Sequence, residues 1–134
     1  MSFQSSKWTR YIFIIILTCA LVFSLVHNYR KRNDLQNRGI LLTGKIRSYE
    51  YGARGHMWFQ YEFNYQGTTY RGETGVFVTN FNQFVGKTFP VIFFKKTKEN
   101  DLLITPRDFE IYHLKYPDSL TWVKNFVDKD KYKL

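Results

Sequence analysis

The side chains that could take part in catalysis or metal binding are few in this chain and widely spaced. The three histidines are His27, His56 and His113, and none has a second histidine or a cysteine at the spacing that metal sites use. We therefore interpret all three as structural or surface residues. The chain is expected to carry no metal site and no other cofactor.

Two acidic residues and one glycine-containing segment are the remaining candidates for chemistry. Glu62 and Glu73 would lie near each other in a hairpin, and paired carboxylates can act as general acid and base. In that hairpin, however, Glu62 faces Arg71, which favours a solvated sheet face. The segment 52–55 is not followed by a helix, as a phosphate-binding loop would require. The residues therefore favour a protein that is not an enzyme, and an enzyme with an unrecognised site is the residual alternative.

A long apolar stretch determines where these residues would work. Residues 11–29 contain no Asp, Glu, Lys or Arg. A helix of about 20 residues crosses the hydrocarbon core of a bilayer, and Trp8, Tyr11 and Tyr29 lie near the two ends, where aromatic rings favour the interface. The sequence predicts a single transmembrane helix within residues 1–32, with the lipid bilayer as a partner and the inner (plasma) membrane as the location.

A cleaved signal peptide is the alternative for this stretch, since basic residues precede it and Cys19 follows a segment similar to a lipoprotein cleavage box. Thr18 stands where such a box usually has Gly, Ala or Ser before the cysteine. The apolar run also continues to Val26, as a membrane span would and a cleaved segment would not. These two observations favour the anchor.

The net charge of +9 is concentrated beside this anchor. Up to Arg47 there are eight basic residues and one acidic residue, whereas the rest of the chain is nearly balanced. Basic residues next to a membrane span are attracted to anionic head groups. We therefore interpret four of them as membrane-surface residues and expect no nucleic-acid binding: Arg30, Lys31, Arg32 and Arg38. Their position after the span favours a cytoplasmic location of the following domain.

Beyond a linker at residues 33–38, the pattern becomes that of β-strands. Residues 57–65 alternate between apolar and polar side chains, and Gln66 and Gly67 can form the tip of a hairpin. This register would pair aromatic with aromatic and acid with base. The expected pairs are Tyr65 with Thr68, Phe63 with Tyr70 and Glu62 with Arg71.

Further strands are expected at residues 40–49, 88–94 and 102–104, with a possible extension at 76–78. Gly44 on an inner face suggests close backbone approach, and Pro90 suggests a sheet edge or a bulge. Thr79 can cap a short helical turn at residues 80–85.

The carboxyl end is expected to be helical. Thr105, Pro106 and Asp108 form a helix-start pattern. It is followed by an apolar stripe of Phe109, Tyr112, His113 and Tyr116. A second helix is expected from Asp118, and the charged tail 128–134 is expected to be solvated. The predicted fold is α+β: the transmembrane helix, a small antiparallel β-barrel or sandwich at residues 39–106, and one or two C-terminal helices at 107–134.

The order of several short segments resembles a known family. The span is followed by Thr43-Gly44-Lys45-Ile46, by residues 59–72 (FQYEFNYQGTTYRG), by residues 85–93 (VGKTFPVIF) and by Leu102-Leu103-Ile104. Over residues 39–106 the chain resembles the bacterial membrane proteins grouped as domain-of-unknown-function family 3592. That family usually has Asp or Asn-Pro after the penultimate strand, where this chain has KKTKEN. The resemblance implies a small β-barrel or sandwich beside a membrane and implies no catalytic residues.

Aromatic residues make up 19% of the chain, but their alternation places most of them inside the domain rather than on a base-stacking surface. Trp58 falls on the opposite face. The favoured interpretation is a single tryptophan covered by the C-terminal helices. The alternative is that Trp58 and neighbouring loop residues form a partner-binding or membrane-touching patch of Tyr51, Arg54, His56 and Trp58. The expected function is a membrane-tethered, non-enzymatic interaction module that binds a protein partner as an accessory or immunity-like subunit. The alternative is a lipid-surface or envelope structural protein.

Overall fold

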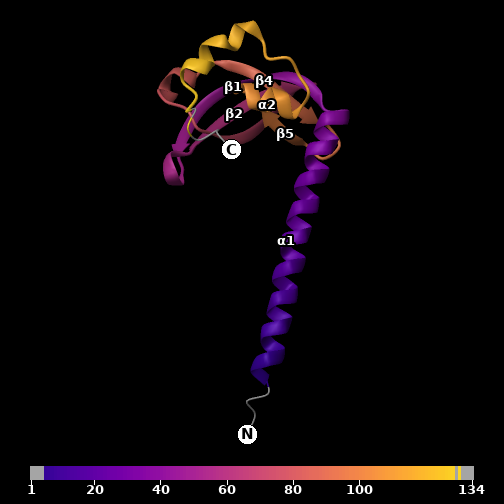
Figure 1. Ribbon diagram of the computed structural model, residues 1–134. Helices are drawn as coiled ribbons and strands as arrows, with labels where there is room; N and C mark the ends of the chain where they lie inside the picture. Colours follow the sequence, from indigo (N-terminus) through magenta and orange to yellow (C-terminus); the bar gives the residue numbers. More distant parts are fainter. Residues whose placement is uncertain (1–4, 129, 131–134) are drawn as a thin grey trace. The chain divides into compact units, whose positions relative to one another are not determined.

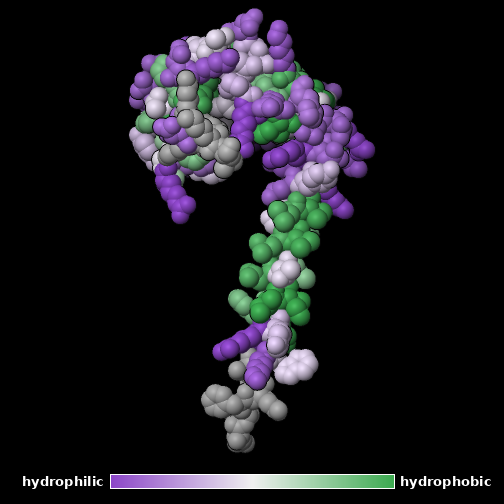
Figure 2. Space-filling model, in the orientation of Figure 1, coloured by the Kyte–Doolittle hydropathy of each residue, from purple (hydrophilic) through white to green (hydrophobic). Residues whose placement is uncertain are grey.

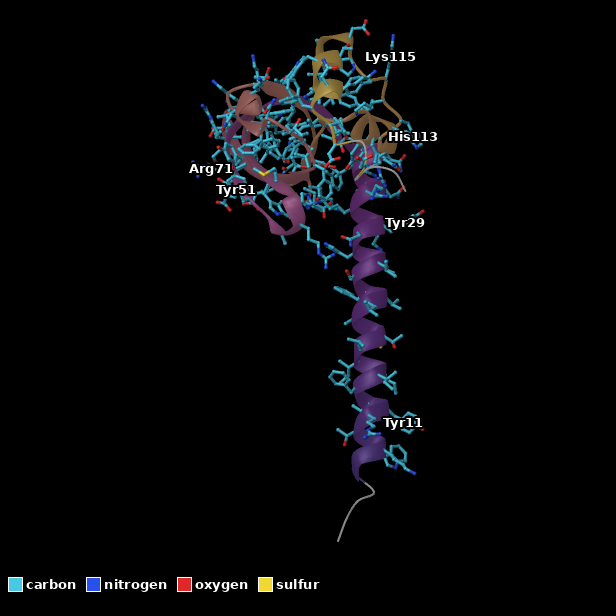
Figure 3. The ribbon with its side chains drawn as sticks, turned by 60° about the vertical axis from the view of Figure 1, so that its left-hand side comes forward. Tyr11, Tyr29, Tyr51, Arg71, His113 and Lys115 are labelled. Atoms are coloured by element: carbon cyan, nitrogen blue, oxygen red, sulfur yellow. The ribbon has the colours of Figure 1, made fainter. Side chains whose placement is uncertain are left out.

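The computed structural model describes residues 5–128 and 130, which form two units. The first unit extends to Asp34 and consists of helix α1 (Ser5–Arg38) up to that residue. Its side chains between Trp8 and Tyr29 are exposed, and the helix is long and apolar enough to cross a membrane. Figure 2 shows the apolar band of this helix between hydrophilic residues at both of its ends, and Figure 3 shows Tyr11 and Tyr29 projecting from it.

The last turn of α1 belongs to the second unit, which begins at Leu35. The segment 33–38 was expected to be a linker, but it is helical. Leu35 is only 2% exposed and is part of the hydrophobic core of the second unit. Gly39 then ends the helix, and its N–H donates to the carbonyl of Leu35 at 3.1 Å. The expected linker is therefore helical because a core contact lies within it and no helix breaker precedes Gly39.

Five antiparallel strands form a nearly closed barrel (Figure 1). They are β1 (Ile40–Tyr51), β2 (Met57–Tyr65), β3 (Thr68–Val76), β4 (Thr88–Phe94) and β5 (Glu99–Leu102), in the order β3-β2-β1-β4-β5. The Tyr61 hydroxyl of β2 donates to Asn100 Oδ1 of β5 at 2.6 Å, across the gap between β3 and β5. The predicted α+β class with an antiparallel barrel is confirmed.

The long strand β1 curves because it pairs with β4 in its first half and with β2 in its second half. Gly44 takes part in both pairings. A Cβ atom at this position would lie 2.5 Å from Val91 Cγ2, so the close approach expected here is present. Beyond Gly44 the register shifts between Ile46 and Ser48, which places a bulge at Arg47. Bulges and glycines allow a strand to bend into a barrel.

The hairpin of β2 and β3 has the register that the sequence predicted. Tyr65 pairs with Thr68, Phe63 with Tyr70 and Glu62 with Arg71. The turn residues Gln66 and Gly67 both have positive φ, at 48° and 80°. Two successive positive φ angles match the right-handed twist of the flanking strands.

Aromatic side chains fill the barrel. Those buried to 2% exposure or less are Phe59, Tyr61, Phe63, Phe84, Phe89 and Phe93. Phe84 comes from the short helix η2 (Phe81–Phe84), and its ring lies 5.2 Å from that of Trp122 in η3 (Asp118–Asn125). The helix expected from Asp118 is thus present as a 3-10 helix. The interior is occupied by the protein's own side chains.

The segment before η2 differs from the prediction. The Thr79 hydroxyl does not cap η2 but donates to the carbonyl of Phe126, and Asn80 precedes the helix with a φ of 50°. Strand β3 ends at Val76, and Val78 instead forms an isolated bridge with Val127. Residues 78 and 79 are thus bonded to the C-terminal segment at residues 126 and 127. Local sequence patterns do not reveal a contact between segments so far apart in the chain.

Strand β4 is apolar on both faces, as its sequence suggested. Val91 and Phe93 face the interior, while Ile92, on the other face, is only 5% exposed. Gly39 and Leu35 cover this outer face, since a Cβ at Gly39 would collide with Ile92 Cγ2 and the Leu35 carbonyl. The side chain of Gln36 also donates to the carbonyl of Ile111, which joins the last turn of α1 to α2 (Pro106–Ile111).

Two expectations around β4 are corrected. No bulge lies at Pro90, because the register of β4 with β1 is continuous, and β4 is an inner strand flanked by β1 and β5. Its carbonyl accepts from Leu103 N–H at 2.8 Å, so the missing donor points to the side where β5 has already ended. The last strand occupies residues 99–102 rather than 102–104, since the polar residues before Leu102 pair with β4.

Helix α2 begins as predicted but ends early. The Asp108 carboxylate accepts from the N–H of Thr105 at 2.7 Å and of Ile104 at 3.0 Å. His113 takes a φ of 55°, and the N–H groups of His113 and Leu114 donate to Glu110 and Phe109 in the manner of a Schellman cap. His113 is therefore exposed beyond the helix instead of continuing its apolar stripe. Most of the expected charged tail lies outside the described residues.

Candidate functional site

The outward side of β1, β2 and β3 carries a polar surface that we call the polar face, defined by Arg47, Gln60, Glu62, Arg71 and Glu73. The face follows from the alternation of β2, because Gln60 and Glu62 point away from the aromatic interior. Together with Tyr61 and Gly72 these five residues line a depression of about 510 Å³. No sequence motif pointed to this depression, because its residues come from three strands.

An ion pair between Arg47 and Glu62 lies at the centre of the polar face. The Nε atom of Arg47 donates to Glu62 Oε1 at 2.6 Å, and Nη2 contacts the same oxygen. The sequence predicted Arg71 as the partner, and Arg71 is indeed the residue opposite in the register. Glu62 nevertheless pairs with Arg47, because the bulge at Arg47 brings an additional side chain from β1 to the carboxylate.

Gln60 connects β1 to β2 beside this pair. Its Oε1 accepts from the hydroxyl of Ser48 at 2.8 Å, and its Nε2 donates to Glu50 Oε1 at 2.9 Å. A side-chain amide that both donates and accepts has its orientation defined by its neighbours. This part of the polar face is therefore preorganised.

Arg71 and Glu73 of β3 make no such bonds. Both side chains are exposed, and within the described part of the chain neither has a hydrogen-bond or ion-pair partner. Figure 3 shows Arg71 directed away from the barrel. The polar face thus offers one unpaired positive and one unpaired negative group next to an internally satisfied centre.

An aromatic stack lies at one end of the same sheet surface. The His56 ring lies 5.0 Å from Trp58 and 4.4 Å from Phe77, nearly parallel to both. Gly75 makes room for it, since a Cβ there would collide with His56 Nε2. Trp58 is 41% exposed, so the favoured interpretation of a tryptophan covered by the C-terminal helices is wrong. We call His56, Trp58 and Phe77 the aromatic stack.

The structure divides the four residues predicted as a partner patch. His56 and Trp58 lie together in the aromatic stack. Tyr51 pairs in the register with the buried Met57, on the other sheet face, and its ring lies 5.2 Å from Phe81. Arg54 lies in η1 (Ala53–Gly55) with a φ of 59°. Partner binding by these residues stays a prediction.

The predicted membrane-surface residues lie in the carboxyl-terminal part of α1. Arg30, Arg32 and Arg38 are exposed, and Lys31 is half-buried. Arg38 lies in the second unit and the other three in the first. The four residues are therefore on a helix, as expected for the flank of a membrane span.

A buried polar pair lies under the depression. The hydroxyl of Tyr61 is hydrogen-bonded to Asn100, and burial, with a smaller contribution from the charge of Asp101, strongly raises the pKa of Tyr61. Asp101 in turn accepts from the Tyr112 hydroxyl at 2.7 Å. These bonds connect Asn100 and Asp101 of β5 to other elements, so we assign them to closure of the barrel.

The described residues contain no group of three or more His, Cys, Asp or Glu that could hold a metal ion. His27 lies in α1, His56 in the aromatic stack and His113 at the end of α2. Glu62 forms an ion pair with Arg47, whereas Glu73 has no ion-pair partner among the described residues. The arrangement is suited to recognition of charged and aromatic groups.

An apolar helix and a small antiparallel β-barrel with a polar outer face define the class of this α+β protein. No protein-family model, no curated protein and no solved structure matches the chain.

Proposed function

We propose that this protein is a single-pass, membrane-anchored interaction module without enzymatic activity, and that its polar face and aromatic stack bind a protein partner. The observation that carries the proposal is the contrast between the two sides of the sheet. The interior is filled by the protein's own aromatic rings, whereas the outer side keeps Trp58 exposed, and Arg71 and Glu73 have no ion-pair partner among residues 5–128 and 130. Recognition therefore takes place on the outside of the barrel.

The chemistry of this surface indicates what the partner presents. Exposed tryptophan and arginine side chains contribute strongly to protein interfaces when a partner buries them. A partner segment with an acidic group near Arg71 and a basic group near Glu73 would complement the polar face. The ordered Gln60 and the Arg47–Glu62 pair lower the entropic cost of binding.

Helix α1 is proposed to be the anchor, because its apolar side chains between Trp8 and Tyr29 are exposed and no protein core covers them. We place the protein in the inner (plasma) membrane of a bacterium, with the barrel in the cytoplasm. The resemblance to family 3592 supports a position beside a membrane, and the basic residues that follow the span favour the cytoplasmic side. A narrower form of the proposal is an accessory or immunity-like subunit, which predicts that the gene of the partner lies next to that of this protein.

Site-specific photo-crosslinking in intact membranes tests the proposal. A photoreactive residue in place of Thr69, exposed on the outer side of β3, should give a reproducible protein adduct. The same residue in place of Thr121, exposed on η3, is the matched control and should give none. Trp58→Ala and Arg71→Glu should each abolish the adduct. A chain that gives no adduct at Thr69, or equal adducts at both positions, contradicts the proposal.

A lipid-surface or envelope structural role is the second candidate, supported by the exposed Arg30 and Arg32 beside the apolar helix. Replacement of Arg30, Lys31 and Arg32 by Gln should reverse the topology or weaken association with anionic liposomes. Unchanged topology and unchanged association would contradict this role.

A further inference from the structure

The turn between β4 and β5 carries three exposed lysines, Lys95, Lys96 and Lys98, which we call the lysine turn. The turn has a defined backbone, because the N–H of Lys98 donates to the carbonyl of Phe94 at 2.8 Å and Lys98 has a φ of 60°. The ammonium group of Lys95 lies 5.9 Å above the ring of Tyr65. The three positive charges are therefore held on a short, ordered projection.

The lysine turn lies at the end of the barrel where the chain arrives from α1. The register pairs Ile40, the first residue of β1, with Phe93 near the end of β4. The turn follows directly beyond this pair, so it projects from the same end of the barrel. Arg38 is exposed at this end, next to the exposed apolar side chains of Ile40 (36%) and Leu41 (57%). Glu99, which begins β5, is half-buried and is the acidic residue closest to the turn in sequence.

We propose that the lysine turn contacts the anionic head groups of the bilayer in which α1 is anchored, and that it thereby makes a second membrane contact. Lysines near an anionic surface are attracted to it, and adjacent apolar side chains can enter the interface. The tether provides the specificity for lipid over other anions. It keeps this end of the barrel close to the membrane span, because only residues 30–39 separate the apolar stretch from β1, so the local concentration of head groups is high. The inference rests on the proposed anchoring by α1.

The contact determines which surface of the barrel remains free. If the end with the lysine turn is held at the head groups, the polar face on β1, β2 and β3 is presented at a defined height above the bilayer. A partner that is itself a membrane protein would then meet a surface of fixed orientation.

Fluorescence quenching of the full chain in nanodiscs tests the inference. Cys19 is the single cysteine, so a Cys19→Ala background allows a fluorophore to be attached through Thr97→Cys in the lysine turn. Ala53→Cys in η1, at the end of β1 remote from Ile40, provides the comparison position. Lipids with a nitroxide on the head group serve as quencher, in phosphatidylcholine alone or with phosphatidylglycerol added.

We expect phosphatidylglycerol to increase quenching at Thr97 on the order of tenfold and to change quenching at Ala53 much less. The variant Lys95→Gln/Lys96→Gln/Lys98→Gln should abolish the increase. The control Lys45→Gln/Lys87→Gln/Lys124→Gln removes the same charge from exposed positions elsewhere and should preserve it. High salt should reduce the increase in the unsubstituted chain.

Equal quenching at Thr97 in both lipids, or stronger quenching at Ala53 than at Thr97, would overturn the inference. An equal effect of the two triple variants would do so as well, since it would indicate a response to net charge alone. Flotation with phosphatidylcholine vesicles distinguishes this failure from failure of the proposed anchor. A chain that floats without quenching at Thr97 contradicts the second contact only, whereas a chain that does not float contradicts both.

Discussion

Arg47 forms an ion pair with Glu62 of the neighbouring strand, although the hairpin register places Glu62 directly opposite Arg71. The bulge in β1 adds one residue to that strand and thereby provides a second arginine for the same carboxylate. Arg71 is left exposed as a consequence. One irregularity in β1 thus separates the arginine that pairs with Glu62 from the one that has no ion-pair partner in the described part of the chain.

This separation predicts different effects for the two arginines. Arg47→Gln should lower the free energy of unfolding by less than about 1 kcal/mol, because its side chain is 53% exposed and solvent screens the pair. Arg71→Gln should leave the free energy of unfolding unchanged but weaken the adduct formed at Thr69. Urea unfolding of the full chain in nanodiscs, followed by tryptophan fluorescence, measures the first quantity. A larger loss of stability for Arg71→Gln than for Arg47→Gln would contradict the assignment.

Gly44 is predicted to tolerate no side chain. In Gly44→Ala the new Cβ would lie 2.5 Å from Val91 Cγ2 in a filled interior, so we expect a loss of about 1–3 kcal/mol in the free energy of unfolding. The double variant Gly44→Ala/Val91→Ala should recover part of that loss relative to the sum of the single variants, as urea unfolding would show. Strict additivity of the two changes would mean that the atoms do not meet.

Asp108 predicts a pH dependence at the start of α2. Asp108→Ala removes the acceptor of two backbone N–H groups and should lower the free energy of unfolding by about 1–2 kcal/mol. Asp108→Asn keeps an oxygen in place and should lower it less. Burial raises the pKa of Asp108, although the N–H groups of Thr105 and Ile104 lower it. The folded chain therefore holds the proton more tightly than the unfolded chain.

The contribution of protonated Asp108 to the free energy of unfolding is fully present below the ordinary pKa of Asp, about 3.9. It is lost as the pH rises above that value. The unsubstituted chain should thus lose stability relative to Asp108→Asn over that range, which parallel urea titrations at several pH values would reveal. A gain relative to Asp108→Asn with rising pH would reverse the sign and refute the prediction.

The buried hydroxyl of Tyr61 should make the folded chain less stable at alkaline pH. Burial raises its pKa, and burial with the nearby Asp108 raises the pKa of Tyr116 to about 12. Both groups stay protonated in the folded chain at a pH where the unfolded chain ionises, so stability is complete below about pH 10 and declines above it. Tyr61→Phe should cost about 1 kcal/mol at neutral pH through its bond to Asn100 and should make the alkaline decline shallower. Circular dichroism at increasing pH measures the decline, and an unchanged slope would argue against the assignment.

The hairpin of β2 and β3 was predictable because its information is local. The alternation of Met57, Phe59, Tyr61 and Phe63 determines which side of β2 is inside, and the short turn determines the register. The start of α2 was predictable for the same reason, since Thr105 and Asp108 are three residues apart. These features depend on neighbours in sequence, which is what periodicity and capping rules describe.

The features that the sequence did not predict depend on contacts between segments that are distant in the chain. Strand β5 begins at Glu99 because the next two side chains accept hydrogen bonds from tyrosine hydroxyl groups, Asn100 from Tyr61 and Asp101 from Tyr112. In the sequence alone, a polar run of this kind predicts a turn. Likewise the polar face could not be predicted as a site. Its central ion pair requires the bulge at Arg47, and its depression requires three strands to be placed side by side.

Leu35 has a practical consequence for any released form of the protein. Its side chain is almost fully enclosed, yet it lies before the first strand and within the same continuous helix as the apolar stretch. A cut or truncation after Arg38 would leave the globular part with an unfilled hole, so soluble fragments that start at Gly39 should aggregate or be degraded, and those that start before Leu35 should persist. Proteolytic release of the globular part should therefore give a stable product only when cleavage occurs upstream of Leu35.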